Sequence, residues 1–260
     1  MTHHWDPKQY DKFKRERNEP FFDLVQLIQP VHHSRILDLG CGNGALTKFI
    51  HEKFHASYTL GIDSSKEMLE KAAPLQNQQL HFEEMDISRF HSKEPFQLII
   101  SNAALQWIPN HADLFEHLTN LLAAGGQMAI QMPANQDYPT HLVAAELASE
   151  EPYRTNMKFA KSPIDKLLSM EEYAKLLDKL GYDNQIVRMQ LYNHFLESTA
   201  GVIEWVKGSL LTYYKSHMDP KLYELFLKEY QQRLIEQLGW SEPFFFTMKR
   251  LFLWAQLPNH

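Results

Sequence analysis

The stretch from Ile36 to Ala45 constrains the fold of this chain more than any other part of its sequence. It reads Ile-Leu-Asp-Leu-Gly-Cys-Gly-Asn-Gly-Ala, so a short apolar run ends in a turn with three glycines, Gly40, Gly42 and Gly44. A helical pattern, Leu46 to Phe54, follows directly. Glycine adopts positive φ at little cost and leaves bare backbone for a ligand, and helix N-termini favour anionic groups. The stretch therefore predicts a strand, a tight turn and a helix that together bind a ligand.

Two kinds of cofactor fit this turn, and one acidic residue discriminates between them. Gly40, Gly42 and Ala45 loosely match the dinucleotide fingerprint. Asp38, however, lies two residues before Gly40, and a fixed carboxylate there repels a pyrophosphate and attracts an ammonium group. S-adenosyl-L-methionine carries an ammonium group, a sulfonium cation and no phosphate, so the turn favours this cofactor. Asp63 ends the next apolar run and suits a ribose diol in either cofactor.

Short apolar strands alternate with helical patterns in the first half of the chain. We expect strands at 35–39, 57–62, 80–85, 96–101 and 126–132, and helices at 20–29, 45–54, 65–73 and 112–123. This alternation is typical of a parallel, doubly wound sheet, whose ligands bind at the carboxyl ends of the strands. Four polar residues end these apolar runs: Asp38, Asp63, Asp86 and Asn102. Together they predict a ligand pocket at one edge of the sheet.

Residues near these strand ends complete the predicted cofactor site. Asp86 would accept a hydrogen bond from the adenine amine, and Ile87 would pack on the adenine ring. Met68 would pack on the other face of the ring, although a methionine there equally suits the core. The full set that we assign to the cofactor is Asp38, Gly40, Gly42, Gly44, Asp63, Ser64, Met68, Asp86, Ile87 and Asn102.

Beyond residue 133 the regular alternation stops. The patterns there predict weak helices in 134–168, a helix over 169–180, a strand over 185–193, two helices in 199–238 that are split near Asp219-Pro220, and a last strand over 246–256. We expect 134–168 and 195–242 to form a helical cap over the substrate. Residues 169–194 and 243–260 would complete the core sheet begun by 31–133, and residues 1–30 would supply an N-terminal lid and helix. The predicted fold class is α/β, with a doubly wound, mostly parallel, seven-stranded sheet and a helical cap.

Composition excludes several classes of function. The 260 residues carry a formal net charge of −6, without the basic block that nucleic-acid binding needs. No apolar run approaches the roughly 20 residues of a membrane span, and the N-terminus lacks the order of a signal peptide. Cys41 is the one cysteine, which excludes an intrachain disulfide and a multi-cysteine zinc site. We therefore expect a cytoplasmic monomer with no metal, nucleic-acid or membrane partner.

The motifs together carry a family resemblance. Asp38–Gly44, Gly61–Ser65 and Asp86 resemble the class I S-adenosylmethionine-dependent methyltransferases. Further stretches across nearly the whole chain look like the trans-aconitate methyltransferase family: Tyr10–Arg17, Ser101–His111, Gln131–Asn135, Pro139–His141, Tyr192–His194, Glu204–Gly208 and Arg250–Phe252. The resemblance implies the Rossmann-like methyltransferase fold. It also implies methyl transfer to a carboxylate oxygen of a small, trans-aconitate-like polycarboxylic acid, with S-adenosyl-L-homocysteine as the second product.

The resemblance further implies a substrate site without a catalytic base. Carboxyl groups titrate near pH 4, so the attacking oxygen is already anionic and needs only positioning and exclusion of water. We expect cations and hydrogen-bond donors to bind the remote carboxylates of the acid, and an aromatic wall beside the methyl group. On the family match we assign these roles to Arg17, Lys207, Arg250, Tyr192, His194 and Trp107. A surface ion pair is the alternative for each cation, and plain packing is the alternative for Trp107.

Two other functions fit the same cofactor motifs. A relative that methylates the malonyl thioester of an acyl carrier protein in biotin synthesis would need a basic docking patch for its acidic partner. A non-catalytic protein that binds S-adenosylmethionine as a signal would keep Asp38 and Asp63 but lack a pocket of substrate size. Cofactor titration and a methyl-transfer assay on a panel of acids separate these functions.

Overall fold

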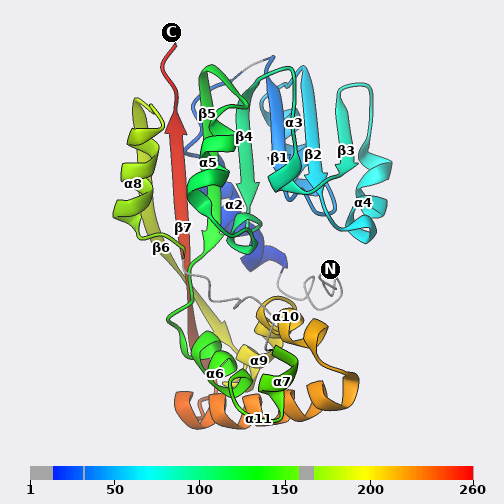
Figure 1. Cartoon of the computed structure of the whole chain (residues 1–260), viewed down its shortest axis with the longest axis vertical. Coiled ribbons are helices and arrows are strands. Elements are labelled where there is room, and N and C mark those ends of the chain that lie inside the picture. Colours follow the sequence, from blue (N-terminus) through cyan, green and yellow to red (C-terminus); the bar gives the residue numbers. More distant parts are fainter. Residues whose placement is uncertain (1–13, 32, 158–166, 260) are drawn as a thin grey trace. The chain divides into compact units, whose positions relative to one another are not determined.

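Seven strands form one sheet within the described part of the chain, in the order β3-β2-β1-β4-β5-β7-β6 (Figure 1). The computed structural model describes residues 14–31, 33–157 and 167–259, with 14–17 as backbone only. The strands are β1 (Arg35–Leu39), β2 (Tyr58–Asp63), β3 (Leu80–Glu84), β4 (Phe96–Asn102), β5 (Leu122–Pro133), β6 (Asn184–Leu196) and β7 (Phe244–Gln256). β1 to β5 pair in parallel, and β7 runs antiparallel to β5, as the opposed arrows in Figure 1 show. The predicted mostly parallel, seven-stranded sheet is confirmed.

The described residues fall into two units. The sheet unit comprises 19–133, 167–190 and 250–260, and the helical unit comprises 1–18, 134–166 and 191–249. Both β6 and β7 contribute residues to each unit. No helix in the described ranges is long and apolar enough to cross a membrane.

Helices cover both faces of the sheet. They are α2 (Lys14–Val25), whose first turn belongs to the helical unit, α3 (Ala45–Lys53), α4 (Lys66–Ala72), α5 (His111–Thr119) and α8 (Met170–Lys179), with short 3-10 turns η1 (Ala73–Leu75), η2 (Ile87–Arg89) and η3 (Leu105–Trp107). On one face, the Gln127 side chain donates to the carbonyl of Gln29, just after α2. On the other face, the Tyr182 hydroxyl donates to Met128 and bonds Thr119 of α5. Because successive residues of a strand point to opposite faces, β5 is covered on both sides, and the sheet is doubly wound.

The central strands are buried on both faces. In β1, Ile36, Leu37 and Leu39 are 0% exposed, and in β4, Leu98 and Ile99 are 0% exposed. Strands of a parallel sheet that is covered on both sides consist of nearly continuous apolar residues, which explains why the sequence located them well. Asp38 lies within this apolar setting at 5% exposure.

Two helix boundaries differ from the sequence predictions. The helix expected over 20–29 spans Lys14–Val25, so Pro20 lies inside the helix instead of in its first turn. A proline in a helix interior removes one N–H donor, and its ring crowds the carbonyl four residues earlier, which is why the sequence pattern places Pro20 at a helix start. The helix expected over 112–123 ends at Thr119, because β5 begins at Leu122 instead of 126. The pairing of β5 with β4 shifts register between Phe96 and Leu98, and glycines in strands often mark such irregularities. Gly125 and Gly126 lie in this irregular part of β5.

The helical unit holds α6 (Pro139–Ala148), α7 (Tyr153–Met157), α9 (Ala200–Lys207), α10 (Leu210–His217) and α11 (Pro220–Leu238). The predicted break at Asp219-Pro220 is confirmed, and the Asp219 carboxylate caps α11 by accepting from the N–H groups of Lys221 and Leu222 at 3.0 Å each. A second break at Gly208 and Ser209 divides the first expected helix into two, so that prediction was wrong. An apolar core with many aromatic rings holds the unit together, including Tyr153, Trp205, Tyr214, Phe226 and Tyr230.

Candidate functional site

The turn between β1 and α3 needs its glycines for conformation and for space. Gly40, Gly42 and Gly44 all have positive φ, at 79°, 55° and 75°. A Cβ atom on Gly44 would lie 2.5 Å from Cζ of Phe82, closer than packed atoms tolerate. The turn is also tied to β2, because the N–H groups of Gly40 and Cys41 donate to the Ile62 carbonyl at 2.8 and 3.0 Å. The turn is therefore a fixed cradle, in which Gly40 and Gly42 are half-buried and Gly44 is buried.

Asp38 is a buried carboxylate at the base of this cradle. It accepts a hydrogen bond from the Thr47 hydroxyl at 2.6 Å. Burial raises its pKa to about 7, the Thr47 hydrogen bond opposes that rise, and the nearby charge of Asp63 adds to it. A buried carboxylate with this pKa gains much from a cationic partner. Asp38 therefore suits an ammonium group better than a phosphate, and its contact with the cofactor stays a prediction.

Asp63 ties two turns together at the end of β2. Its Oδ2 accepts from the Gly42 N–H at 2.9 Å, and its Oδ1 accepts from the Ser65 N–H at 2.8 Å. Each carboxylate oxygen still has a lone pair for a ribose hydroxyl. Met68 is 9% exposed, and its Cε would lie 3.2 Å from a Cβ on Gly42, so its side chain packs close to the cradle. Ser64 is exposed beside Asp63.

Replacing Asp63 by alanine should weaken the binding of S-adenosylhomocysteine by about 1.5–3 kcal/mol, because hydrogen bonds to a charged group are lost. That loss corresponds to about a 10- to 150-fold rise in Kd. Isothermal titration calorimetry measures it directly. Asp178→Ala, which removes an exposed carboxylate from α8, is the control and should leave Kd unchanged. An unchanged Kd in Asp63→Ala would exclude the predicted role.

Asp86 and Ile87 follow β3. The Asp86 Oδ1 accepts from the Ser88 N–H at 2.8 Å and from the Ser88 hydroxyl at 2.6 Å, and these hydrogen bonds hold the pKa of Asp86 below its usual value. Asp86 thus caps η2 through its Oδ1, and within the described residues its Oδ2 accepts no hydrogen bond. Ile87 is 9% exposed. An adenine clamp by these two residues stays a prediction, and helix capping alone also accounts for the aspartate.

The turn after β4 is strained and presents an unpaired acceptor. Ala103 has φ of +55°, its N–H donates to the Gln131 carbonyl at 2.9 Å, and its own carbonyl accepts from the Gln106 side chain at 2.7 Å. Positive φ in a residue with a Cβ costs energy and clusters at functional sites. The Oδ1 of Asn102 is buried and has no hydrogen-bond partner among the described residues. Such an orphaned acceptor at the carboxyl end of a strand is expected where a ligand binds.

The residues predicted to bind substrate divide between the two units. Trp107, 44% exposed on η3, and Arg250, 8% exposed on β7, belong to the sheet unit with the cofactor set. Tyr192 and His194 are buried in the helical unit, where the His194 ring lies 4.7 Å from the Trp205 ring between centroids. The roles of these residues stay predictions.

The two remaining cations predicted to bind substrate are Lys207, whose side chain the structure describes, and Arg17, whose side chain it does not. Lys207 forms an ion pair with Glu204 one turn earlier on α9, which is the surface alternative considered from the sequence. Arg17 lies in α2, and its side chain is outside the described residues, as is the segment 1–13 predicted to act as a lid. Their roles also stay predictions.

Sequence reasoning gave no role to two buried polar residues of this edge. Gln131 is 1% exposed on β5, and its Nε2 has no hydrogen-bond partner among the described residues. His111 bonds the Tyr173 hydroxyl and, at 3.0 Å, the Leu105 carbonyl, and burial lowers its pKa, so the neutral ring anchors the turn after β4. A glutamine near the carboxyl end of a largely apolar strand was the signal in the sequence that could have drawn attention to Gln131.

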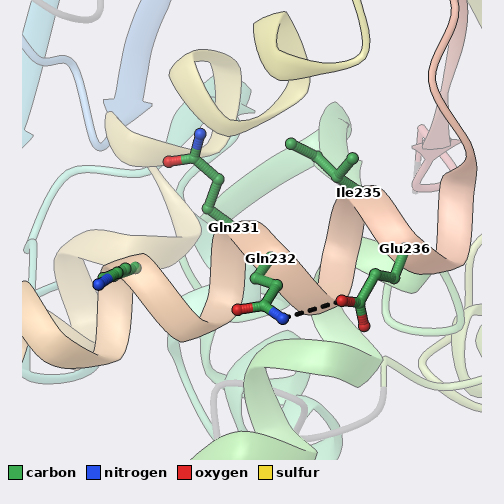
Figure 2. A pocket seen from close by; sticks show the side chains of 5 residues that line it. Gln231, Gln232, Ile235 and Glu236 are labelled. Carbon is green, nitrogen blue, oxygen red and sulfur yellow. Dashed lines mark hydrogen bonds between the residues drawn. The ribbon is translucent and has the colours of Figure 1, made fainter.

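A hollow of about 480 Å³ lies elsewhere, on the helical unit (Figure 2). All its lining residues belong to α11: Lys228, Gln231, Gln232, Ile235 and Glu236. Gln232 donates to Glu236 at 2.9 Å, as the dashed line in Figure 2 marks. A single helix face without a nucleophile or a buried charge offers no reactive arrangement. Within the described ranges, no group of three His, Cys, Asp or Glu side chains could hold a metal ion.

Comparison with known proteins agrees with this geometry. A family model described as a methyltransferase domain matches residues 13–186. Trans-aconitate 2-methyltransferase of Deinococcus radiodurans is 35% identical over 263 residues, which cover 98% of this chain and 99% of that protein. The enzyme of the same name from Rhizobium leguminosarum bv. trifolii is 37% identical and covers 88% of this chain and 89% of its own.

A solved structure shares the fold. Phosphoethanolamine N-methyltransferase 2 of Haemonchus contortus, in complex with S-adenosyl-L-methionine, has a TM-score of 0.56 at 17% identity, over 93% of this chain and 52% of that one. The sheet order, the glycine cradle with its two acids, and the full-length relatives lead to one conclusion. This chain belongs to the trans-aconitate 2-methyltransferase family of S-adenosylmethionine-dependent methyltransferases.

Proposed function

We propose that this protein esterifies one carboxylate of trans-aconitate, or of a closely related small polycarboxylic acid, with S-adenosylmethionine as methyl donor. The observation that carries the proposal is the extent of the relationship. It covers 98% of this chain and 99% of the Deinococcus enzyme, so it includes the helical unit as well as the cofactor fold. We also propose that the enzyme acts in the cytoplasm and as a monomer.

The sheet edge supports this activity from the cofactor side. When bound, S-adenosylmethionine supplies an electrophilic methyl group on a positively charged sulfur. Asp38 would hold its ammonium group, Asp63 its ribose, and Asp86 with Ile87 its adenine. The Asn102 Oδ1, buried and unpaired within the described residues, would accept a hydrogen bond from the bound cofactor. Each of the polar contacts would pair an acceptor of the protein with a positively charged or donor group of the cofactor, and Ile87 would add apolar packing.

The chain needs no proton-transfer residue for this reaction. A carboxylate is anionic at neutral pH, so the work of the protein is to hold the attacking oxygen in line with the methyl group. Interactions with the other carboxylates can supply the binding energy for this positioning. Arg17, Lys207, Arg250, Tyr192 and His194 are the predicted contacts, and arginine is the best suited because it binds carboxylates through two parallel hydrogen bonds.

Product identification tests the proposal. The purified protein is incubated with isotopically methyl-labelled S-adenosylmethionine and, separately, with trans-aconitate, cis-aconitate, citrate, isocitrate and malonyl-acyl carrier protein. We expect mass spectrometry to detect a labelled monomethyl ester of trans-aconitate and an equal amount of S-adenosylhomocysteine. Methylation of the carrier protein alone would replace the proposal by the biotin-synthesis function. Cofactor binding in calorimetry without transfer to any acid would indicate a non-catalytic binding protein.

A further inference from the structure

Polar side chains form a row along one face of an otherwise apolar sheet. Asp38 of β1 is level with Ile100 of β4, Asn102 lies two residues beyond Ile100, and Asn102 is level with Gln131 of β5. Residues paired in register, and residues two apart on one strand, point to the same face. Asp38, Asn102 and Gln131 therefore share a face, on three neighbouring strands near their carboxyl ends.

The row continues onto β7. Gln131 pairs with Phe252, and Pro133, two residues further along β5, pairs with Arg250. Arg250 thus lies on the same face as Gln131 and one pleat repeat, roughly 7 Å, further toward the carboxyl end of β5. The side chain of Arg250 is 8% exposed.

The amide of Gln131 differs from that of a second glutamine on the same strand and face. The Oε1 of Gln127 accepts from the Gln29 N–H and from the Trp254 ring N–H at 2.8 Å each, and its Nε2 donates to the Gln29 carbonyl at 3.2 Å. Gln127 is therefore satisfied by the fold. Gln131 is equally buried, at 1% exposure, yet its Nε2 lacks a partner in the described part of the chain. An unpaired buried donor is costly, so a group that is not part of the fold is expected to accept from it.

The order of the row indicates the kind of group. Acceptors occupy β1 and β4, namely the Asp38 carboxylate and the unpaired Asn102 Oδ1, and they suit the cationic cofactor. Donors occupy β5 and β7, namely the Gln131 amide and the Arg250 guanidinium, and they suit an anion. The row therefore changes from hydrogen-bond acceptors to donors between β4 and β5. A positively charged methyl donor and a carboxylate would meet at this change.

We propose that Nε2 of Gln131 donates a hydrogen bond to the substrate carboxylate that accepts the methyl group, while Arg250 faces a carboxylate further out. This inference rests on the proposed function. A neutral amide orients the carboxylate without cancelling the negative charge that makes its oxygen nucleophilic. A guanidinium at the same level would form a charge-assisted pair and would place a second positive charge near the sulfonium. Gln131 is thus a positioning residue that sets specificity for an anion.

Gln131→Met tests this role, because methionine has a similar length and no donor. With trans-aconitate we expect kcat/KM to fall by about 10- to 100-fold, as for loss of a hydrogen bond to a charged group. The Kd of S-adenosylhomocysteine should stay within about twofold of wild type, since Gln131 lies on the substrate side of the row. The melting temperature should be unchanged or higher, because a buried unpaired amide has been removed. Gln131→Glu, which brings a like charge toward the carboxylate, should lose more activity than Gln131→Met.

Gln127→Met is the matched control. It leaves two N–H donors and a carbonyl without their partner, so it should lower the melting temperature while kcat/KM of the folded enzyme stays close to wild type. If Gln131→Met shows this control pattern instead, Gln131 is only structural and the inference is wrong.

Calorimetric binding of tricarballylate, a saturated tricarboxylate, in the presence of S-adenosylhomocysteine separates this inference from the proposed function. If wild type binds the acid, Gln131→Met binds it at least about tenfold more weakly, and no acid is methylated, the anion site stands and the proposed reaction fails. If wild type methylates trans-aconitate and Gln131→Met has an unchanged kcat/KM, the reaction stands and the inference fails. If wild type neither binds nor methylates any of the acids, both are wrong.

Discussion

Asp38→Asn should lower the affinity for S-adenosylmethionine by about 100-fold or more at pH 8, because one partner of a buried ion pair is removed. Asparagine has the same shape and can still accept from Thr47, so the cradle should keep its geometry. The unliganded variant should be more stable than wild type at this pH, because it no longer buries a carboxylate whose pKa is raised to about 7. Calorimetry and chemical denaturation measure these two opposite effects.

The pH dependence gives the same prediction a second readout. The pKa of Asp38 in the folded protein, about 7, lies above its ordinary value of 3.8, so the native state holds an extra proton between these values. Its contribution to stability is therefore fully present below about pH 4 and is lost as the pH rises through 7. Binding of an ammonium group requires the ionised carboxylate, so affinity should fall about tenfold for each pH unit below 7.

Asp38→Asn should abolish both the pH dependence of stability and the pH dependence of cofactor affinity that arise from this carboxylate. Thr47→Val, which removes the hydrogen bond that opposes the rise in pKa, should move the change in affinity to higher pH. Asp178→Asn on α8 alters an exposed carboxylate and should change neither of these two pH dependences. Wild-type affinity that is independent of pH between 5 and 7 would show that Asp38 does not pair with the ammonium group.

Gly44→Ala should lower the free energy of unfolding by about 2–5 kcal/mol, the sum of a left-handed residue with a side chain and an overpacked core. Gly44 has φ of +75°, and its added Cβ would meet Phe82 at 2.5 Å and Ala72 at 2.9 Å. Urea denaturation of the unliganded protein measures the change. Cofactor binding should weaken as well, because the turn must shift to accommodate the methyl group.

Gly181→Ala provides the control for backbone strain alone. Gly181 has φ of +87°, but a Cβ there would meet nothing within 4 Å. Gly181→Ala should therefore lower the free energy of unfolding by only about 1–2 kcal/mol. The double variant Gly44→Ala with Phe82→Leu should recover part of the packing loss, and a double-mutant cycle isolates that part. Equal losses in Gly44→Ala and Gly181→Ala would show that the ring of Phe82 moves aside freely.

The sequence predicts the sheet well for a physical reason. Strands buried on both faces are apolar throughout, and Asp63, Asp86 and Asn102 are visible because they follow such runs at or near the carboxyl ends of strands. Local patterns were less reliable where tertiary packing or strand pairing offsets the conformational cost of a residue. Pro20 lies inside a helix, and β5 extends back through the glycines at 125–126, because pairing with neighbouring strands and packing outweigh local preference.

The position of Gln131 relative to substrate-side residues could not be predicted from local pattern. It depends on the register between β5 and β7, which are separated by more than a hundred residues of sequence. The roles of Tyr192, His194 and Lys207 rest on the family resemblance, since nothing in their local sequence distinguishes a ligand contact from packing or an ion pair. Local pattern therefore revealed Asp63 and Asn102, which end strands, but missed Gln131 within β5 and His111 on α5.

The two hydrogen bonds that the Asp63 carboxylate accepts from Gly42 and Ser65 also bear on how the cofactor enters. They fix both turns before any ligand arrives, so the protein is preorganised at this edge and loses little backbone entropy on association. The ribose would then bind to turns that already have their bound conformation. Asp63→Ala should loosen both turns, so that their amide protons exchange faster with solvent.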